Sequence, residues 1–230
     1  MMPERWRQTF LAWAQTNDHR RALEDARRRI RDALAHSRRP FVSYSGGKDS
    51  TAMLHFVLQE APDIMVLHWD YGRAFVPQPV HEEILHIART MGVRNLRVET
   101  SPLYERLGRR ATNVMGRHLI GRLLPQLAAE GYDLDFVGLR AEESLKRRRR
   151  IRRQKRVSML PECWPLQDWR WLDVWAYLVA HGVPYLSLYD VRAALVGYDQ
   201  ARFTTLFDPE FADVGSEMDN VLHWRWRNQQ

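Results

Sequence analysis

The spacing of apolar residues predicts strands that alternate with helices along most of the chain. Short apolar runs at 41–44, 64–69, 96–99 and 134–138 are typical of strands buried on both faces. Helical spacing marks the segments between them, at 52–60, about 80–91 and about 114–130. Because strands alternating with helices form right-handed crossovers, we predict an α/β fold, a mainly parallel twisted sheet with helices on both faces.

Helical patterns also flank this core. Residues 3–36 predict two helices that form an N-terminal helical layer, with Asn17 or Asp18 as a cap. A last helix is predicted from Trp171 to His181, before Gly182 and Pro184. We therefore divide the chain into N-terminal helices at 1–39, an α/β domain at 40–190 and a C-terminal tail at 191–230. Aromatic residues at amphipathic helical spacing are expected to pack in the core: Trp169, Trp171, Trp175 and Tyr177.

Composition restricts the class of protein. The chain has 230 residues and is 45% hydrophobic and 27% charged, which is ordinary globular usage. Its longest apolar run, 174–180, is far shorter than the roughly 20 residues of a membrane-spanning helix. The charged N-terminus lacks the apolar stretch of a secretory signal, so we expect a cytoplasmic protein without a membrane partner.

The single cysteine and the distribution of charge add two constraints. Cys163 alone cannot form an intrachain disulfide or a self-contained iron–sulfur cluster, so no cluster is expected. The formal net charge is +7, but residues 146–156 contain nine basic residues and no acidic one. The rest of the chain is therefore slightly negative. We call residues 146–156 the basic segment.

A glycine-rich loop, residues 45–51, lies between the first predicted strand and a helix. Its sequence is Ser-Gly-Gly-Lys-Asp-Ser-Thr. Backbone N–H groups of such a loop can converge on an anion, and the N-terminus of the following helix adds positive potential. The loop is not a Walker A motif, because Val42 and Asp49 occupy positions where that motif needs Gly and Ser or Thr. Transfer of the γ phosphate is therefore disfavoured.

The segment Ser-Tyr-Ser-Gly-Gly-Lys-Asp-Ser, residues 43–50, resembles the PP-loop of the ATP pyrophosphatase superfamily, also called adenine nucleotide alpha hydrolases. Three more segments resemble the branch that contains PAPS reductases and the small subunit of ATP sulfurylase. These are His-Trp-Asp-Tyr-Gly at 68–72, Gly-Leu-Arg-Ala-Glu-Glu-Ser at 138–144 and Trp-Pro-Leu-Gln-Asp-Trp at 164–169 with its continuation to Asp190. Tyr71 replaces the Thr of the family's Asp-Thr-Gly segment.

The resemblance implies an enzyme that cleaves ATP at the α phosphorus. It assigns Lys48, Asp49 and Arg140 to catalysis, with Asp49 also a possible Mg²⁺ ligand. It assigns these residues to the ATP phosphates: Ser43, Ser45, Gly46, Gly47, Lys48, Asp49, Ser50 and Thr51. It assigns these to the adenosine: His68, Trp69, Asp70 and Gly138. ATP and Mg²⁺ are the implied cofactors.

The chain departs from the reductases in one respect. They use a cysteine near the C-terminus as the nucleophile, and residues 221–228 contain none. A PAPS or adenylylsulfate reductase-like protein is therefore the alternative reading, and Cys163 is expected to be a buried structural thiol. A second alternative is a non-catalytic, nucleotide-dependent module that binds nucleic acid.

Adenylation of an acceptor with release of pyrophosphate is the favoured reaction, and three acceptors remain open. Sulfate would imply a GTPase partner. DNA or tRNA would imply phosphorothioation or thiolation with sulfur from a cysteine desulfurase. An orphan acceptor is the third. The residues leave the oligomeric state open.

The basic segment bears on the acceptor. Its cations are candidates for binding a polyanion such as DNA or tRNA, namely Lys146, Arg147, Arg148, Arg149, Arg150, Arg152 and Arg153. The same segment could instead dock an acidic protein or close over the triphosphate. Since adjacent like charges repel, we expect a segment that becomes ordered only when an anion neutralises it.

Overall fold

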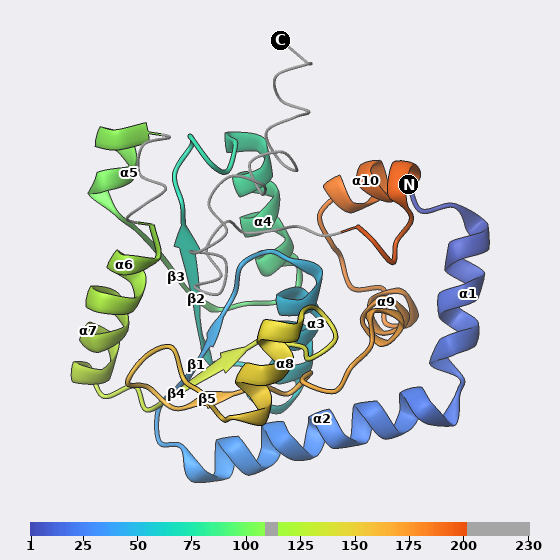
Figure 1. Ribbon diagram of the computed structural model, residues 1–230, viewed down its shortest axis with the longest axis horizontal. Helices are drawn as coiled ribbons and strands as arrows, with labels where there is room; N and C mark the ends of the chain where they lie inside the picture. The colour runs from blue at the N-terminus through green and yellow to red at the C-terminus, as the bar shows by residue number, and fades with distance from the viewer. Residues whose placement is uncertain (109–114, 202–230) are drawn as a thin grey trace.

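A computed structural model describes residues 1–108 and 115–201 (Figure 1). Within these residues, five strands form one sheet in the order β3-β2-β1-β4-β5, and every neighbouring pair is parallel. The strands are β1 Pro40–Ser43, β2 Met65–Asp70, β3 Asn95–Thr100, β4 Leu134–Val137 and β5 Glu162–Cys163. The predicted α/β architecture is confirmed, and the two-residue strand β5 adds an edge that the sequence pattern did not predict.

Helices cover both faces of the sheet. The helices that pack around it are α3 Lys48–Glu60, α4 Gln78–Thr90, α5 Pro102–Leu107, α6 Met115–His118, α7 Leu124–Ala129, α8 Leu145–Arg152, α9 Trp171–Ala180 and α10 Leu188–Val196. Figure 1 shows α6 and α7 on one side of the strands, with α3 and α4 on the other. None of the helices in the described ranges is long and apolar enough to cross a membrane.

The N-terminal helices α1 Glu4–Ala14 and α2 Asn17–His36 form an outer layer against α9 and α3. Buried Asp173 on α9 accepts hydrogen bonds from the indole N–H of Trp13, at 2.8 Å, and contacts His19 Nδ1, at 3.0 Å. The cap of α2 is Thr16, whose Oγ1 accepts from the backbone N–H of His19. The prediction of Asn17 or Asp18 as the cap is therefore wrong by one or two positions.

The helix predicted at 114–130 is interrupted by the π-helical segment η2, Leu119–Leu123. In η2 the N–H of Leu124 reaches back five residues to the carbonyl of Leu119. The next residue, Pro125, has no N–H to donate, so the regular helical ladder cannot continue through it. The π segment accommodates this gap immediately before α7 begins.

The basic segment contributes most of α8, so the expectation that it stays unordered without an anion differs from the structure. Ser144 caps the helix, accepting from the N–H of Arg147 at 3.0 Å. Buried Ile151 packs with Leu139 and Trp164 in a small apolar cluster. These contacts, and ion pairs described below, offset the repulsion among the arginines.

The C-terminal boundary also shifts. The tail predicted to begin at residue 191 starts inside α10, which continues to Val196. Of the rest of that tail, residues 197–201 are described and residues 202–230 lie outside the described ranges. The predicted packing of aromatic residues is confirmed, since Trp169, Trp175 and Tyr177 are fully buried and Trp171 packs against the same core.

Candidate functional site

The glycine-rich loop follows β1 directly, and α3 begins inside it at Lys48. The hydroxyls of Ser45 and Ser50 lie 3.0 Å apart, and Ser50 also donates to the carbonyl of Gly47. The N–H of Lys48 donates to the hydroxyl of Tyr189 on α10, at 2.8 Å. The loop is therefore a closed turn at a helix N-terminus, where the helix dipole favours bound anions.

Two glycines allow the backbone to close in this way. Gly46 has φ of +80°, a conformation that other residues rarely adopt, and a Cβ there would lie 2.5 Å from Ile84. Gly138, just after β4, lies against the first turn of α3. A Cβ on Gly138 would lie 2.9 Å from the backbone nitrogen of Ser50. Side chains at either position would displace the loop.

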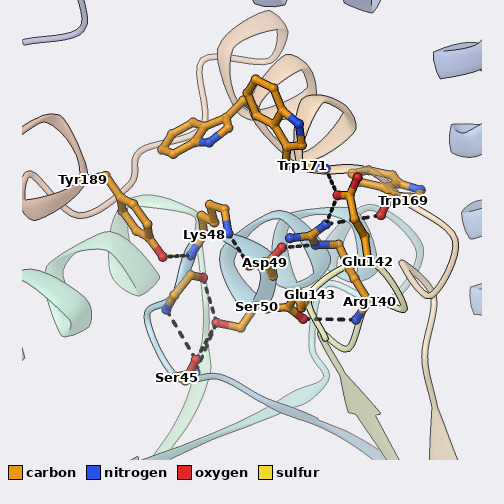
Figure 2. Close-up of polar contacts among 12 residues, drawn as sticks. Ser45, Lys48, Asp49, Ser50, Arg140, Glu142, Glu143, Trp169, Trp171 and Tyr189 are labelled. Carbon is orange, nitrogen blue, oxygen red and sulfur yellow. Dashed lines mark hydrogen bonds and ion pairs between the residues drawn. The ribbon is translucent and has the colours of Figure 1, made fainter. Parts of the chain in front are cut away.

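Three buried charged residues form an ion-pair network beneath the loop: Lys48, Asp49 and Arg140 (Figure 2). Lys48 Nζ lies 2.7 Å from one carboxylate oxygen of Asp49, and Arg140 Nε donates to the other. Arg140 also donates to Glu142, at 3.0 Å, and to the carbonyl of Trp169. The strand-to-helix loop and the loop after β4 are thus joined through Asp49.

Burial and charge act in opposite directions on this network. Burial lowers the pKa of Lys48, and the carboxylate of Asp49 opposes that effect. Burial alone would raise the pKa of Asp49, but the charges of Arg140 and Lys48 hold it well below its ordinary value. Asp49 is therefore an ionised carboxylate with a cation on each oxygen.

Asp49 was also predicted to be a magnesium ligand. A carboxylate ligand must offer at least one oxygen to the metal. Both oxygens of Asp49 are engaged by Lys48 and Arg140. The structure shows Asp49 as the carboxylate that joins the two cations, and its contact with Mg²⁺ stays a prediction.

A cavity of about 220 Å³ opens beside the loop. One end is formed by the glycine-rich loop, through Ser45, Gly47, Asp49 and Ser50, together with Gly138. Its walls are apolar, from β2 and β4 on the sheet and from α6, η2 and α7 above it. The apolar and aromatic lining residues are Tyr44, Leu67, Trp69, Tyr71, Leu119, Ile120, Leu124, Val137, Leu139 and Val157.

The structure does not bring all predicted site residues to this cavity. Four predicted residues are buried but do not line the cavity: Gly46, Lys48 and Thr51 of the loop, and Arg140 beside it. Lys48 and Arg140 contact Asp49, which does line the cavity.

Of the residues predicted to contact adenosine, Trp69 and Gly138 line the cavity, and two others do not. His68 points to the opposite face of the sheet, since side chains alternate along a strand, and its Nδ1 contacts the carbonyl of Tyr44. Burial lowers the pKa of His68 to about 4. Asp70 is a turn residue that accepts from the N–H of Gly72 at 2.9 Å. His68 and Asp70 therefore lie outside the lining of this cavity, and their contact with adenosine stays a prediction.

The opposite end of the cavity is acidic, which the sequence analysis missed. We call Ser43, Asp135 and Glu162 the cavity floor; they come from β1, β4 and β5. Ser43, predicted to hold phosphate, donates to Asp135 at 2.9 Å. Glu162 pairs with Arg150 and accepts from the indole N–H of Trp164. A carboxylate inside the apolar run 134–138 was the available signal.

These contacts separate the cations of the basic segment into two groups, those that face the cavity and those exposed on the surface. Arg150 is buried against Glu162, and Arg147 pairs with Glu143, so both face the cavity. The sequence had predicted Arg150 as part of an exposed surface that binds a polyanion. Because Arg150 is buried, that prediction is wrong for this residue. The exposed cations of the segment are Lys146, Arg148, Arg149, Arg152, Arg153, Lys155 and Arg156.

Comparison with known proteins agrees with this fold. A family model described as the phosphoadenosine phosphosulfate reductase domain matches residues 39–219. The structure of phosphoadenylyl-sulfate (PAPS) reductase from Candida auris, a phosphate complex, aligns with a TM-score of 0.52. It is 14% identical, covering 73% of this chain and 85% of that one, and thus supports the fold.

Two curated relatives match over most of the chain. An uncharacterized protein of Methanocaldococcus jannaschii is 29% identical over 222 residues, or 82% of this chain and 46% of that protein. Sulfate adenylyltransferase subunit 2 of a Mycobacterium species is 28% identical over 209 residues, or 74% of this chain and 64% of that subunit. The chain thus spans about half to two thirds of the length of these relatives.

Proposed function

Because the chain belongs to the phosphoadenosine phosphosulfate reductase domain family, we propose that it is an adenylyltransferase-type enzyme of sulfur metabolism. It binds ATP in the cavity beside the glycine-rich loop. An acceptor attacks the α phosphorus, pyrophosphate leaves, and the acceptor receives the adenylyl group. The sulfate adenylyltransferase relatives support this class of chemistry over reduction.

One observation carries the proposal: the glycine-rich loop forms one polar end of a cavity whose walls are largely apolar. Ser45, Gly47 and Ser50 face that end, at the N-terminus of α3. Trp69 and the apolar residues of η2 offer walls for a nucleoside. Phosphates at the loop and a base between apolar walls account for both features.

The charged network supplies the electrostatics of this reaction. Lys48 lies beside Asp49 at the edge of the cavity, and its positive charge there stabilises the charge that develops on the leaving pyrophosphate, a preorganised interaction that favours the transition state. Asp49 and Arg140 hold Lys48 and the glycine-rich loop in position. Magnesium enters this proposal with ATP, as the counter-ion of its phosphates.

Sulfate is the first candidate acceptor. The relatives named sulfate adenylyltransferase subunit 2 are subunits of a larger enzyme, so a partner subunit is part of this proposal. The test is turnover of ATP, measured as AMP-linked product and pyrophosphate, with sulfate, DNA and tRNA added in turn. Stimulation by sulfate alone supports sulfate activation, whereas stimulation by a nucleic acid alone contradicts it.

A nucleic-acid acceptor is the second candidate, and the exposed cations of the basic segment favour it. They lie on α8 and just beyond it, and the same helix turns Arg147 toward the cavity. A bound phosphate backbone would thus pass close to the ATP site. In that case sulfur would come from a separate cysteine desulfurase.

Salt dependence tests this second candidate. If duplex DNA or tRNA binds, the logarithm of affinity should fall with the logarithm of salt, with a slope of about −0.9 per duplex phosphate neutralised. Replacing four exposed arginines by serine should flatten that slope while ATP binding stays within about threefold. The four are Arg148, Arg149, Arg152 and Arg153.

A matched variant controls for net charge. It replaces four exposed arginines of α1 and α2, namely Arg5, Arg7, Arg20 and Arg21. Nucleic-acid binding measured by fluorescence anisotropy should respond to the α8 variant alone. An equal response to both variants, or no binding at low salt, argues against this surface.

Substitution of the single cysteine tests the alternative of a reductase. Cys163 contacts the carbonyl of Arg29, and burial raises the pKa of its thiol to about 12. Such a thiol is a poor nucleophile. Cys163→Ser should therefore retain ATP turnover within about twofold. Thioredoxin-dependent sulfite release from PAPS, lost in Cys163→Ser, would restore the reductase reading.

A further inference from the structure

The cavity floor contains a buried polar atom that the protein itself does not satisfy. Asp135 is 5% exposed and lines the cavity. Its Oδ2 accepts from the hydroxyl of Ser43, but its Oδ1 has no hydrogen-bond partner among the described residues. Leaving a buried polar atom unpaired costs about 1–3 kcal/mol, so such atoms call for an explanation.

Neighbouring Glu162 does not share this deficit. It lies beside Asp135 in the register of β4 and β5. Its Oε2 accepts from Arg150 and Trp164, and its Oε1 accepts from the N–H of Val157. The floor thus has one carboxylate that Arg150 neutralises, and a second, on the cavity-lining residue Asp135, with a buried oxygen that has no partner among the described residues.

The position of Asp135 along β4 matches the place where the base of a nucleotide bound at the loop would lie. Asp135 precedes Gly138 by three residues on an extended strand, so it lies about 10 Å below the level of the glycine-rich loop. That separation is comparable to the span of a nucleoside. The wall between the two ends is apolar, from Leu67 and Val137 on the sheet and Ile120 on η2. A ligand with phosphates at the loop would present the polar edge of its base to Asp135.

We infer that Asp135 determines nucleobase specificity by donating a hydrogen bond from Oδ1 to an unprotonated ring nitrogen of the base. Ser43 orients the carboxyl group by donating to its other oxygen. The inference rests on the proposed function, because it takes the cavity as the ATP site. It adds Asp135 as the residue that recognises the nucleobase.

The electrostatic surroundings support a protonated Asp135. Burial raises its pKa well above the ordinary value, and the nearby charge of Glu162 raises it further, while hydrogen bonds from Ser43 and the charge of Arg150 oppose the change. A neutral carboxylic acid can donate, and apolar sites use one in this way. Glu162 on β5 and Arg150 on α8 are the charged groups that face Asp135 from the packed elements.

Two substitutions distinguish base recognition from a structural role. Asp135→Leu removes the donor but fills the space, whereas Asp135→Asn keeps an N–H donor and an oxygen for Ser43. The ligands are α,β-methylene-ATP, which cannot be cut at the proposed bond, and inorganic pyrophosphate, which has no base. Dissociation constants are measured by calorimetry.

Asp135→Leu should weaken binding of the ATP analogue at least tenfold and leave pyrophosphate binding within about twofold, because only the base contact is lost. Asp135→Asn should retain the analogue within about threefold. Wild-type affinity should fall as pH rises through the raised pKa of Asp135, and Asp135→Asn should show a smaller fall over the same range.

Other outcomes contradict the inference. Unchanged analogue binding in Asp135→Leu, or equal weakening for analogue and pyrophosphate, would overturn it while leaving the proposed function intact. A loss in Asp135→Asn as large as that in Asp135→Leu would exclude a donor role. If the wild type binds neither ligand, the inference and the proposed function both fail.

Discussion

Replacing Lys48 by alanine should lower ATP turnover at least tenfold, equivalent to about 1.4 kcal/mol of barrier. Lys48 is 4% exposed, its Nζ lies 2.7 Å from Asp49, and its backbone N–H is held by Tyr189. The ammonium group is therefore fixed before ATP binds, as preorganised stabilisation of a leaving group requires. Substitution also leaves Asp49 with one cation instead of two.

The matched control is Lys155→Ala, because Lys155 is exposed and lies on the basic segment. Its initial rate of pyrophosphate release should equal that of the wild type within about twofold. A Lys48→Ala enzyme as fast as the control, at saturating ATP, would remove Lys48 from the proposed mechanism.

Arg140→Met should lower the free energy of unfolding by about 3–5 kcal/mol, the usual cost of removing one partner of a buried ion pair. Arg140 is 3% exposed and contacts Asp49, Glu142 and the carbonyl of Trp169. Methionine fills much of the volume but cannot donate. The carboxylate of Asp49 then loses one of its two cations in a site that is largely buried.

Denaturant unfolding measures this loss, with Arg20→Met as the control because Arg20 is exposed on α2. The midpoint should fall for Arg140→Met and remain near the wild-type value for Arg20→Met, with similar slopes. A midpoint unchanged by Arg140→Met would mean that the network beneath the loop contributes little to the fold.

Local patterns predicted the central fold because strand, loop and helix signals are encoded in short segments. The four longer strands and the start of the glycine-rich loop follow from the apolar runs and the Gly-Gly pair. The two-residue strand β5 and the π segment η2 do not follow, since each depends on neighbours distant in sequence or on Pro125. The order of α8 likewise depends on the tertiary ion pair between Arg150 and Glu162.

The candidate site was predicted less completely than the fold. The motif identified the loop, but only the sheet register separates Trp69, which lines the cavity, from His68 on the other face. Tyr189 and Asp135 lie 141 and 92 residues from Lys48 and Ser43, the residues they contact. Their roles arise only when the chain folds, and a motif restricted to contiguous residues cannot contain them.

The position at which ATP is cut tests the central claim most directly. Purified protein is incubated with ATP radiolabelled at the α phosphate, with sulfate, DNA or tRNA as acceptor, and the products are separated by chromatography. The account predicts label in AMP or an AMP-linked product, with one pyrophosphate released per turnover. Label recovered in ADP, with release of orthophosphate, would contradict it.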